Sequence, residues 1–178
     1  MTYAVDPNGW LHVDAPDARV VELGGGSAPQ WHPNVDVRMC FDPAGRPTVD
    51  FTADFGQPLP MLSAEWDVVF SRYAIEHISW RLIGGFVTEL FRILKPGGSA
   101  VIITANAEAQ MHWALARDWD ERVSQCLGGD QDYPDNSHKT FLNPPWAARL
   151  FREAGFARVI VYPHGELATD MVIEALKP

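Results

Sequence analysis

The stretch VVELGGGSAP, residues 20–29, decides how this chain is expected to fold. Its first four residues are apolar apart from Glu22, which predicts a short buried strand. Three glycines, Gly24, Gly25 and Gly26, follow directly. Because glycine has no Cβ and readily takes a positive φ, the chain can turn sharply there and its backbone can lie against a ligand. Open α/β sheets bind nucleotides at such a turn, although glycine turns also simply connect elements.

Length and composition narrow the class of protein. A chain of 178 residues is long enough for one hydrophobic core, so we expect a single domain over residues 1–178. The net charge is −9 and no lysine- and arginine-rich run is present, so nucleic acid is not an expected partner. Neither a signal peptide nor an apolar run of membrane-spanning length is found, which predicts a cytoplasmic protein without a membrane partner.

The rest of the chain alternates between strand-like and helix-like segments. After a short strand near residues 10–13, apolar runs predict strands at residues 20–23, 35–41, 48–52, 66–71, 100–104, 157–162 and 171–176. Helical spacing of apolar residues predicts helices at residues 73–94, 107–127 and 144–155, the last with Asn143 as its N-cap. Strands that alternate with helices form a mostly parallel sheet with crossover connections, which is an α/β fold.

Acids end two of the predicted strands. Asp42 closes the second strand, 18 residues after Gly24, and Asp54 follows the third. An acid about 20 residues beyond a glycine turn suits hydrogen bonding to a ribose diol. Ser71 ends the next strand. The glycine turn, the two acids and Ser71 thus follow one another along the strand ends, which fits a nucleoside lying across the carboxyl ends of the strands. Taken singly, each acid has the alternative of a loop carboxylate in water.

Five motifs follow one another along residues 19–162. They are VVELGGGS at residues 20–27, Asp42, DFGQPLP at residues 54–60, WDVVFSRYAIEHI at residues 66–78 and LFRILKPGG at residues 90–98, and AGF at residues 154–156 also fits. In this order they resemble the class I S-adenosylmethionine (SAM)-dependent methyltransferases, in particular the methyltransferase-11-like group. The resemblance implies a Rossmann-like, mostly parallel seven-stranded sheet with one antiparallel strand. It also implies SAM as the cofactor, with S-adenosylhomocysteine (SAH) as the product.

The same resemblance assigns the cofactor residues. Glu22 and the backbone of Gly24, Gly25 and Gly26 would hold the methionine part of SAM, and Asp42 would take the ribose hydroxyls. Asp54 and the Phe55 backbone would address adenine, and Ser71 and Arg72 would lie under the sulfonium. An acid-rich, partly aromatic cleft suits a cationic sulfur, an amine, a diol and a flat base.

The acceptor and its chemistry are less constrained. The expected acceptor is a small molecule or a glycan, with Tyr73, Trp113 and Tyr133 as candidate pocket walls. His77 and His138 are candidate general bases for a hydroxyl or ammonium acceptor. Alternatively, His77 packs at a helix start or bonds the glycine loop, and His138 is a surface loop residue. The acids near His138 lack a recognised ligand spacing, so no metal is expected.

Residues 107–140 are expected to form an insertion or lid that shapes the acceptor site. Within it, one helical face carries Met111, Leu115, Trp119, Val123 and Cys126. Core packing accounts for this stripe better than a ligand-binding role does.

The chain departs from the family pattern on one side of the sheet. The segments after the first two strands are too short and proline-rich for crossover helices, and the N-terminal helix is missing. One sheet face should therefore lack helices, and a bare apolar face is unstable in water. We expect either a second copy in a homodimer or the helix over residues 107–127 to cover it.

Two alternatives to a methyltransferase stay open from the sequence. The chain could be a SAM- or SAH-binding partner subunit without catalysis. It could also be an NAD(P)-dependent oxidoreductase, but Ala28 and Pro29 replace the helix start and third glycine of that fingerprint.

Overall fold

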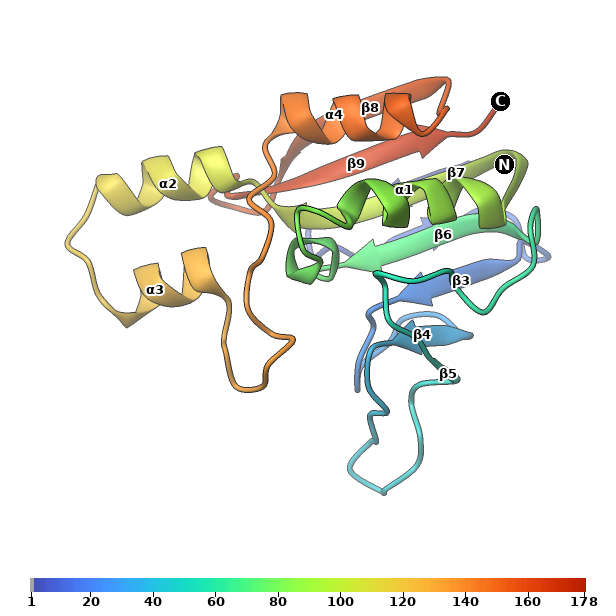
Figure 1. Ribbon diagram of the computed structural model, residues 1–178, viewed down its shortest axis with the longest axis horizontal. Coiled ribbons are helices and arrows are strands. Elements are labelled where there is room, and N and C mark those ends of the chain that lie inside the picture. The colour runs from blue at the N-terminus through green and yellow to red at the C-terminus, as the bar shows by residue number, and fades with distance from the viewer. Residues whose placement is uncertain (1) are drawn as a thin grey trace.

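A seven-stranded sheet forms the centre of the computed structural model, which describes residues 2–178 (Figure 1). Its order is β5–β4–β3–β6–β7–β9–β8. The strands are β3 (Val20–Leu23), β4 (Asn34–Asp36), β5 (Phe51–Thr52), β6 (Trp66–Arg72), β7 (Leu94–Ala105), β8 (Arg158–His164) and β9 (Asp170–Leu176). Only β9 runs antiparallel to its neighbours, β7 and β8. The predicted mostly parallel α/β sheet with one antiparallel strand is confirmed.

The direction of winding reverses beside β3. The chain runs from β3 outward to β4 and β5, then returns to the other side of β3 with β6 and β7. Open α/β sheets bind ligands at the carboxyl ends of the strands at such a reversal. The turns after β3, β4 and β6 therefore meet at the edge of the sheet where a ligand is expected.

Helices cover one face of this sheet. They are α1 (Ile83–Ile93) and α4 (Pro144–Glu153), preceded in the chain by the short 3-10 turn η1 (Ile75–His77). The helical spacing of α1 buries Ile83, Phe86, Val87, Leu90 and Ile93 against the sheet. The Asn143 side chain accepts a hydrogen bond from the Trp146 N–H over 3.1 Å, which confirms the predicted N-cap.

The first of these predicted helices is shorter than expected. It begins at Ile83 rather than near residue 73, because residues 75–77 form a 3-10 turn first. Leu82 directly precedes the helix and is 46% exposed.

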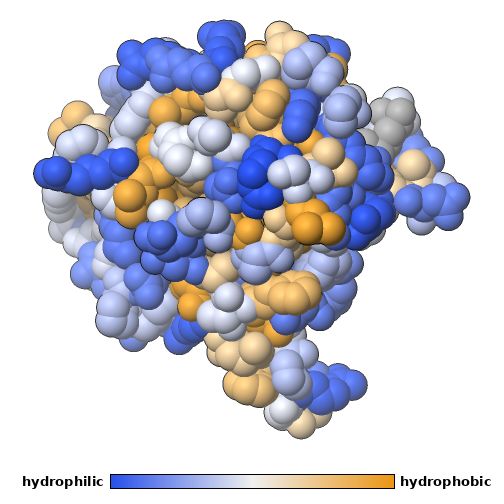
Figure 2. Space-filling view, turned by 45° about the vertical axis from the view of Figure 1, so that its right-hand side comes forward, coloured by the Kyte–Doolittle hydropathy of each residue, from blue (hydrophilic) through white to orange (hydrophobic). Residues whose placement is uncertain are grey.

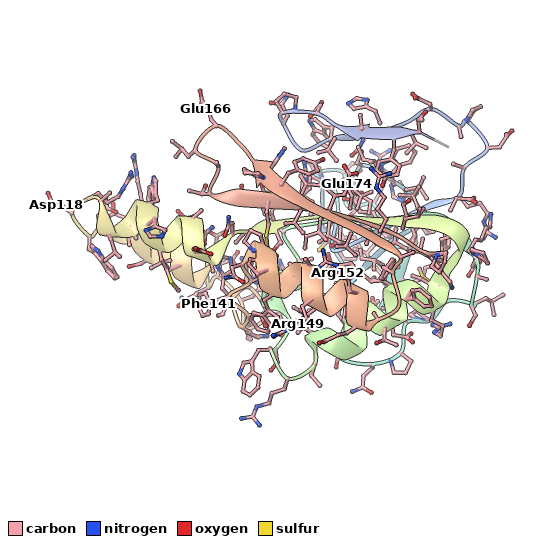
Figure 3. The ribbon with its side chains drawn as sticks, turned by 90° about the horizontal axis from the view of Figure 1, so that it is seen from above. Asp118, Phe141, Arg149, Arg152, Glu166 and Glu174 are labelled. Carbon is pink, nitrogen blue, oxygen red and sulfur yellow. The ribbon has the colours of Figure 1, made fainter. Side chains whose placement is uncertain are left out.

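A hairpin covers the opposite face. Strands β1 (Tyr3–Val5) and β2 (Leu11–Val13) pair antiparallel and lie on the other side of the sheet from α1 and α4 (Figure 3). Leu11 is buried there with Val20, Val68, Phe70, Val101, Ile103 and Val172. None of these buried residues belongs to a helix, so the prediction that helices are reduced on one face is confirmed for residues 2–178.

One of the two predicted covers for this face is wrong, and the other is untested. The segment over residues 107–127 does not fold back over it, since α2 (Ala107–Leu115) and α3 (Glu121–Gly128) project beyond the carboxyl ends of the strands (Figure 1). The hairpin supplies cover instead. A homodimer stays an untested prediction, which sedimentation of the full chain can decide.

Residues 107–127 form two helices rather than the single helix predicted. Asp120 accepts hydrogen bonds from the N–H groups of Arg122 at 3.0 Å and Val123 at 3.1 Å, and so starts α3 as a new helix. Asp118 lies at the tip between the two helices (Figure 3). The prediction that the apolar face of residues 107–127 packs in the core is wrong for three of its residues. Met111, Leu115 and Trp119 are 47%, 73% and 66% exposed.

Strand β4 is also shorter than predicted. It ends at Asp36, although the apolar alternation continues to Phe41. Its outer neighbour β5 forms only two residue pairs with it, Val35 with Phe51 and Asp36 with Thr52. Without a partner for further pairing the chain leaves the sheet, and Met39 and Phe41 are exposed.

The outer surface carries no single dominating apolar area on the side seen in Figure 2, where apolar side chains are interspersed with polar ones. Of the helices described in residues 2–178, none has both the length and the apolar character to cross a bilayer.

Candidate functional site

The turn after β3 can be built only from glycine at two positions. Gly24 has φ +82°, and a Cβ there would lie 2.4 Å from the Ala74 Cβ. At Gly25 a Cβ would lie 2.8 Å from Asn34 Oδ1 and 2.9 Å from Glu22 Cδ. All three distances are too short for a side chain, so the bare backbone lies at this edge of the sheet.

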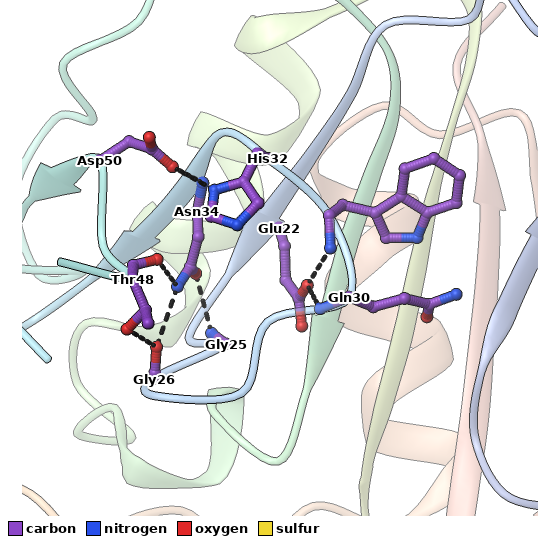
Figure 4. A network of polar contacts seen from close by, with 9 residues as sticks. Glu22, Gly25, Gly26, Gln30, His32, Asn34, Thr48 and Asp50 are labelled. Carbon is purple, nitrogen blue, oxygen red and sulfur yellow. Dashed lines mark hydrogen bonds and ion pairs between the residues drawn. The ribbon is translucent and has the colours of Figure 1, made fainter. Parts of the chain in front are cut away.

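A polar network holds the turn in place (Figure 4). Asn34 Oδ1 accepts the Gly25 N–H at 3.1 Å, and its Nδ2 donates to the carbonyls of Gly26 and Thr48 at 3.2 and 3.1 Å. The Thr48 hydroxyl donates to the same Gly26 carbonyl at 2.9 Å. These bonds fix a segment that has no crossover helix to support it.

Glu22 is buried beneath this turn with one oxygen free. Its Oε2 accepts the N–H groups of Gln30 at 2.6 Å and Trp31 at 2.8 Å (Figure 4). Its Oε1 is buried and has no hydrogen-bond partner within residues 2–178. Burial raises the pKa of Glu22 above its usual value, against the hydrogen bonds from Trp31 and Gln30. A cationic group of a ligand would satisfy this oxygen.

The acid at the end of the second core strand is Asp36 and not Asp42. Asp36 is 8% exposed, and its Oδ2 accepts the Gly26 N–H at 2.9 Å. Asp42 lies in a turn, where its Oδ2 accepts Arg46 Nε at 2.6 Å and its Oδ1 accepts the Ala44 N–H at 2.9 Å. The strand was predicted to run to residue 41, but it ends at Asp36, so Asp42 is not a strand-end acid. A proline-rich loop rather than a helix connects β3 to β4, so the second strand comes sooner after the glycine turn. The short connection could have indicated that the strand-end acid is Asp36.

Two adjoining clefts open along this edge. The glycine-turn cleft, about 330 Å³, is lined by residues that include Glu22, the three glycines, Arg38 and Arg72. The Phe55 cleft, about 190 Å³, is lined by residues that include Asp54, Phe55, Ile78 and Leu82. Gly24, Asp36, Tyr73 and Tyr133 line both clefts, so the two adjoin. Asp42 lines neither.

The other predicted cofactor residues fall into two groups. Asp54, Phe55 and Arg72 line the clefts, with the Arg72 guanidinium 4.5 Å from the centre of the Trp10 ring. Ser71 lines neither cleft and is fully buried. Its hydroxyl donates to the Leu23 carbonyl at 2.8 Å, so it joins two strands rather than facing a ligand.

Of the predicted acceptor walls, two reach the clefts. Tyr73 has φ +53° and is 45% exposed, and its hydroxyl donates to Asp170 Oδ2 at 2.9 Å. Tyr133 lies under the Arg38 guanidinium, 3.6 Å from the centre of its ring. Trp113 lines none of the clefts described here and stacks on Arg117 at 3.5 Å.

A third cavity, the imidazole cleft, brings the two predicted histidines together. It measures about 310 Å³ and is lined by residues that include Tyr73, Glu76, His77, Gln110, His138 and Asp170. The His77 and His138 rings are 5.1 Å apart at their centres. Tyr73 and His77 also line the Phe55 cleft, so the imidazole cleft lies next to it.

Burial sets the charge of this third cavity. It lowers the pKa of both His77 and His138, which favours neutral imidazoles. Glu76 is 2% exposed, and its Oε2 accepts the Thr104 hydroxyl at 2.9 Å. Burial raises the pKa of Glu76 to about 7. The Glu76 carbonyl accepts the N–H groups of Lys139 and Thr140, which ties the loop bearing His138 to η1.

Comparison with known proteins supports the family. A family model described as a methyltransferase domain matches residues 36–102. A 2-phytyl-1,4-naphtoquinone methyltransferase of Thermosynechococcus vestitus is 35% identical over 83 residues, which cover 42% of this chain. The matched part spans only 36% of that relative.

Solved structures share the fold. A Thermotoga maritima SAM-dependent methyltransferase, described as a possible histamine N-methyltransferase, matches with TM-score 0.64, 18% identity and coverage of 93% of this chain and 84% of that one. The Haemonchus contortus phosphoethanolamine N-methyltransferase 2, in complex with SAM, matches with TM-score 0.59, 13% identity and coverage of 90% and 49%. At these identities the likeness establishes the fold.

The matched segment runs from the end of β4 through η1 and α1 into β7, and so includes the strand-end acid Asp36 and both Asp54 and Phe55. The family match and the shared fold together confirm the predicted resemblance: this chain has the fold of the class I SAM-dependent methyltransferases, and its residues 36–102 match a methyltransferase-domain model.

Proposed function

We propose that this protein transfers a methyl group from SAM to a small-molecule or glycan-type acceptor. One observation carries the proposal: two adjoining clefts at the winding reversal bring together an unpaired buried carboxyl oxygen, a bare glycine turn and a strand-end acid. SAM supplies a methyl group already activated on a sulfonium, so the protein has mainly to align the reactants and exclude water.

The chemistry of the cleft residues fits SAM part by part. The free Oε1 of Glu22 and the backbone of residues 24–26 suit the amine of the methionine part, and Arg72 supplies a cation for its carboxylate. Asp36, rather than Asp42, is proposed for the ribose hydroxyls. Asp54 and Phe55 are proposed for adenine, and Ser71 acts only by positioning the strand end.

The acceptor is proposed to enter beside Tyr73 and Tyr133. Residues 107–140 would form a lid within a single domain, because the loop after α3 brings Tyr133 to both cofactor clefts. His77 and His138 are proposed to take a proton from a hydroxyl or ammonium acceptor. Each ring donates from Nδ1 to a carbonyl, which leaves Nε2 free to accept.

A SAM- or SAH-binding partner subunit without catalysis is the second candidate. The segment after the glycine turn is a loop, so no helix N-terminus follows it to support an anionic group. Weaker cofactor binding than a full class I scaffold provides would suit such a role.

Titration calorimetry with SAM and SAH tests cofactor binding, and a SAH-release assay over an acceptor panel tests catalysis. Binding of both, weakened in Asp36→Ala, together with turnover supports the methyltransferase. Binding without turnover on any acceptor favours the partner subunit. Binding of NADH but not of SAM would overturn both.

A further inference from the structure

We propose that Glu76, His77 and His138 form a binding site for a divalent first-row transition metal, with Zn²⁺ as the reference ion. One ligand atom from each of these residues lies within 4.8 Å of the other two. The residues come from η1 and from the loop before α4, which are far apart in the chain. No ligand spacing in the sequence reveals the group, because the fold alone assembles it.

The hydrogen bonds of the two histidines favour this role. His77 Nδ1 lies 3.2 Å from the Ser137 carbonyl, and His138 Nδ1 lies 3.2 Å from the Leu127 carbonyl. A carbonyl only accepts, so each Nδ1 must carry the proton. Each Nε2 then keeps its lone pair. Metal-binding histidines are typically oriented in this way, with the second nitrogen donating to a backbone carbonyl.

The carboxylate is positioned by its own hydrogen bond. Glu76 is buried, and the Thr104 hydroxyl bonds its Oε2 at 2.9 Å. Two imidazoles and one carboxylate form a ligand set used by catalytic zinc, which leaves a further position open. Imidazole ligands also favour Zn²⁺, Fe²⁺ or Co²⁺ over Mg²⁺ and Ca²⁺, which prefer oxygen.

A polar side chain from another element lines the same cavity. Gln110, on α2, is 6% exposed and lines the imidazole cleft. Its side-chain amide can both donate and accept hydrogen bonds. It would therefore suit a metal-bound water or an acceptor oxygen in this cavity.

Binding of the ion requires the three ligand atoms to move closer together. Bonds of about 2.1 Å place tetrahedral ligands about 3.4 Å apart, closer than the limit of 4.8 Å seen here. His138 lies on the loop between α3 and α4, so a shift of this loop can bring its ring inward.

The catalytic use of the ion rests on the proposed methyltransferase function. Tyr73 and His77 line both the Phe55 cleft and the imidazole cleft, so an ion here would lie beside the cofactor site. It would bind an acceptor oxygen and favour its deprotonation. The two imidazoles would then act through the ion rather than as bases.

Calorimetric titration of the metal-free, tag-free full chain with Zn²⁺ tests the site, with metal content measured after dialysis. Co²⁺ serves as a second probe, since its visible bands report on coordination geometry. The variants are His77→Ala, His138→Ala and Glu76→Gln, with His112→Ala on the exposed face of α2 as the matched control. Circular dichroism confirms that each variant is folded, and His138→Gln replaces any that is not.

We expect one Zn²⁺ per chain in the wild type and in His112→Ala. Affinity should fall in the site variants by more than the roughly tenfold to hundredfold that loss of an outer-shell partner costs, because each variant removes a direct ligand. Absence of binding in the wild type, or equal loss in His112→Ala, would overturn the site. SAM titration of the same metal-free samples separates the two proposals. SAM binding without Zn²⁺ binding rejects only the metal site, and Zn²⁺ binding without SAM binding rejects only the methyltransferase.

Discussion

The Asp36 carboxylate accepts a hydrogen bond from the Gly26 N–H over 2.9 Å, which joins the end of β4 to the turn after β3. The register places this acid, since Leu23 pairs with Val35 and Asp36 is the next residue. A carboxyl acceptor and a bare backbone thus lie together where the glycine-turn cleft and the Phe55 cleft adjoin.

Asp36→Ala should weaken SAH binding far more than Asp42→Ala. Loss of a hydrogen bond to a charged group costs about 1.5–3 kcal/mol, which is about tenfold to a hundredfold in Kd. Asp42 binds Arg46 in an exposed turn and lines neither cleft, so its variant should bind as the wild type does. Calorimetry on the three proteins measures this, and equal losses would contradict the assignment of Asp36.

Gly24→Ala should destabilise the fold beyond the strain of a positive φ alone. Gly45 is the matched control, because its φ is +76° but a Cβ there meets nothing within 4 Å. We expect about 1–2 kcal/mol for Gly45→Ala, from backbone strain. Gly24→Ala adds the contact with Ala74 and should lose about 1–3 kcal/mol more. Urea denaturation measures both, and similar values would show that the turn has room for a side chain.

Leu11→Ala should show whether the hairpin covers the sheet. Leu11 is 1% exposed against the sheet face, so its truncation should lower the free energy of unfolding by about 2–5 kcal/mol. Leu115 on α2 is 73% exposed, and Leu115→Ala should change stability by no more than about 0.5 kcal/mol. A small effect at Leu11 in chemical denaturation would mean that something other than the hairpin protects this face.

Glu22→Gln should lower the affinity for SAM and raise the stability of the fold at higher pH. Burial raises the pKa of Glu22 above 4.5, so the folded protein keeps a proton that the unfolded chain releases. The stability contributed by this group is therefore present below pH 4.5 and is lost as the pH rises through the folded pKa. Glutamine does not titrate, so the free energy of unfolding of the variant should rise relative to that of the wild type as the pH rises.

Thermal melts between pH 4 and pH 8 measure this difference in Tm. We expect the Tm of Glu22→Gln to rise relative to that of the wild type by about 2–4 °C for each kcal/mol of unfolding free energy that the wild type loses with rising pH. SAM binding should fall in the same variant, because the free Oε1 of Glu22 is replaced. A Tm difference that does not change with pH would show that Glu22 titrates normally in the folded protein.

The local pattern of residues was sufficient for much of the fold and for part of the site. Strand β3 has the bounds that its apolar run predicts, and the cap at Asn143 starts α4 as expected. The glycines at 24–26 and the pair Asp54 and Phe55 lie in the clefts, because strand ends and turns are encoded by neighbouring residues.

Tertiary structure alone decided where β4 stops and which acid faces the clefts. A strand ends where its partner ends, and β5 offers two paired residues, so Asp36 takes the place predicted for Asp42. The same holds for Glu76 and His138, which lie on different elements and share a cavity only once the loop after α3 bonds to the backbone of η1. Pairing and long-range contact are properties of two segments together, and no single stretch of sequence contains them.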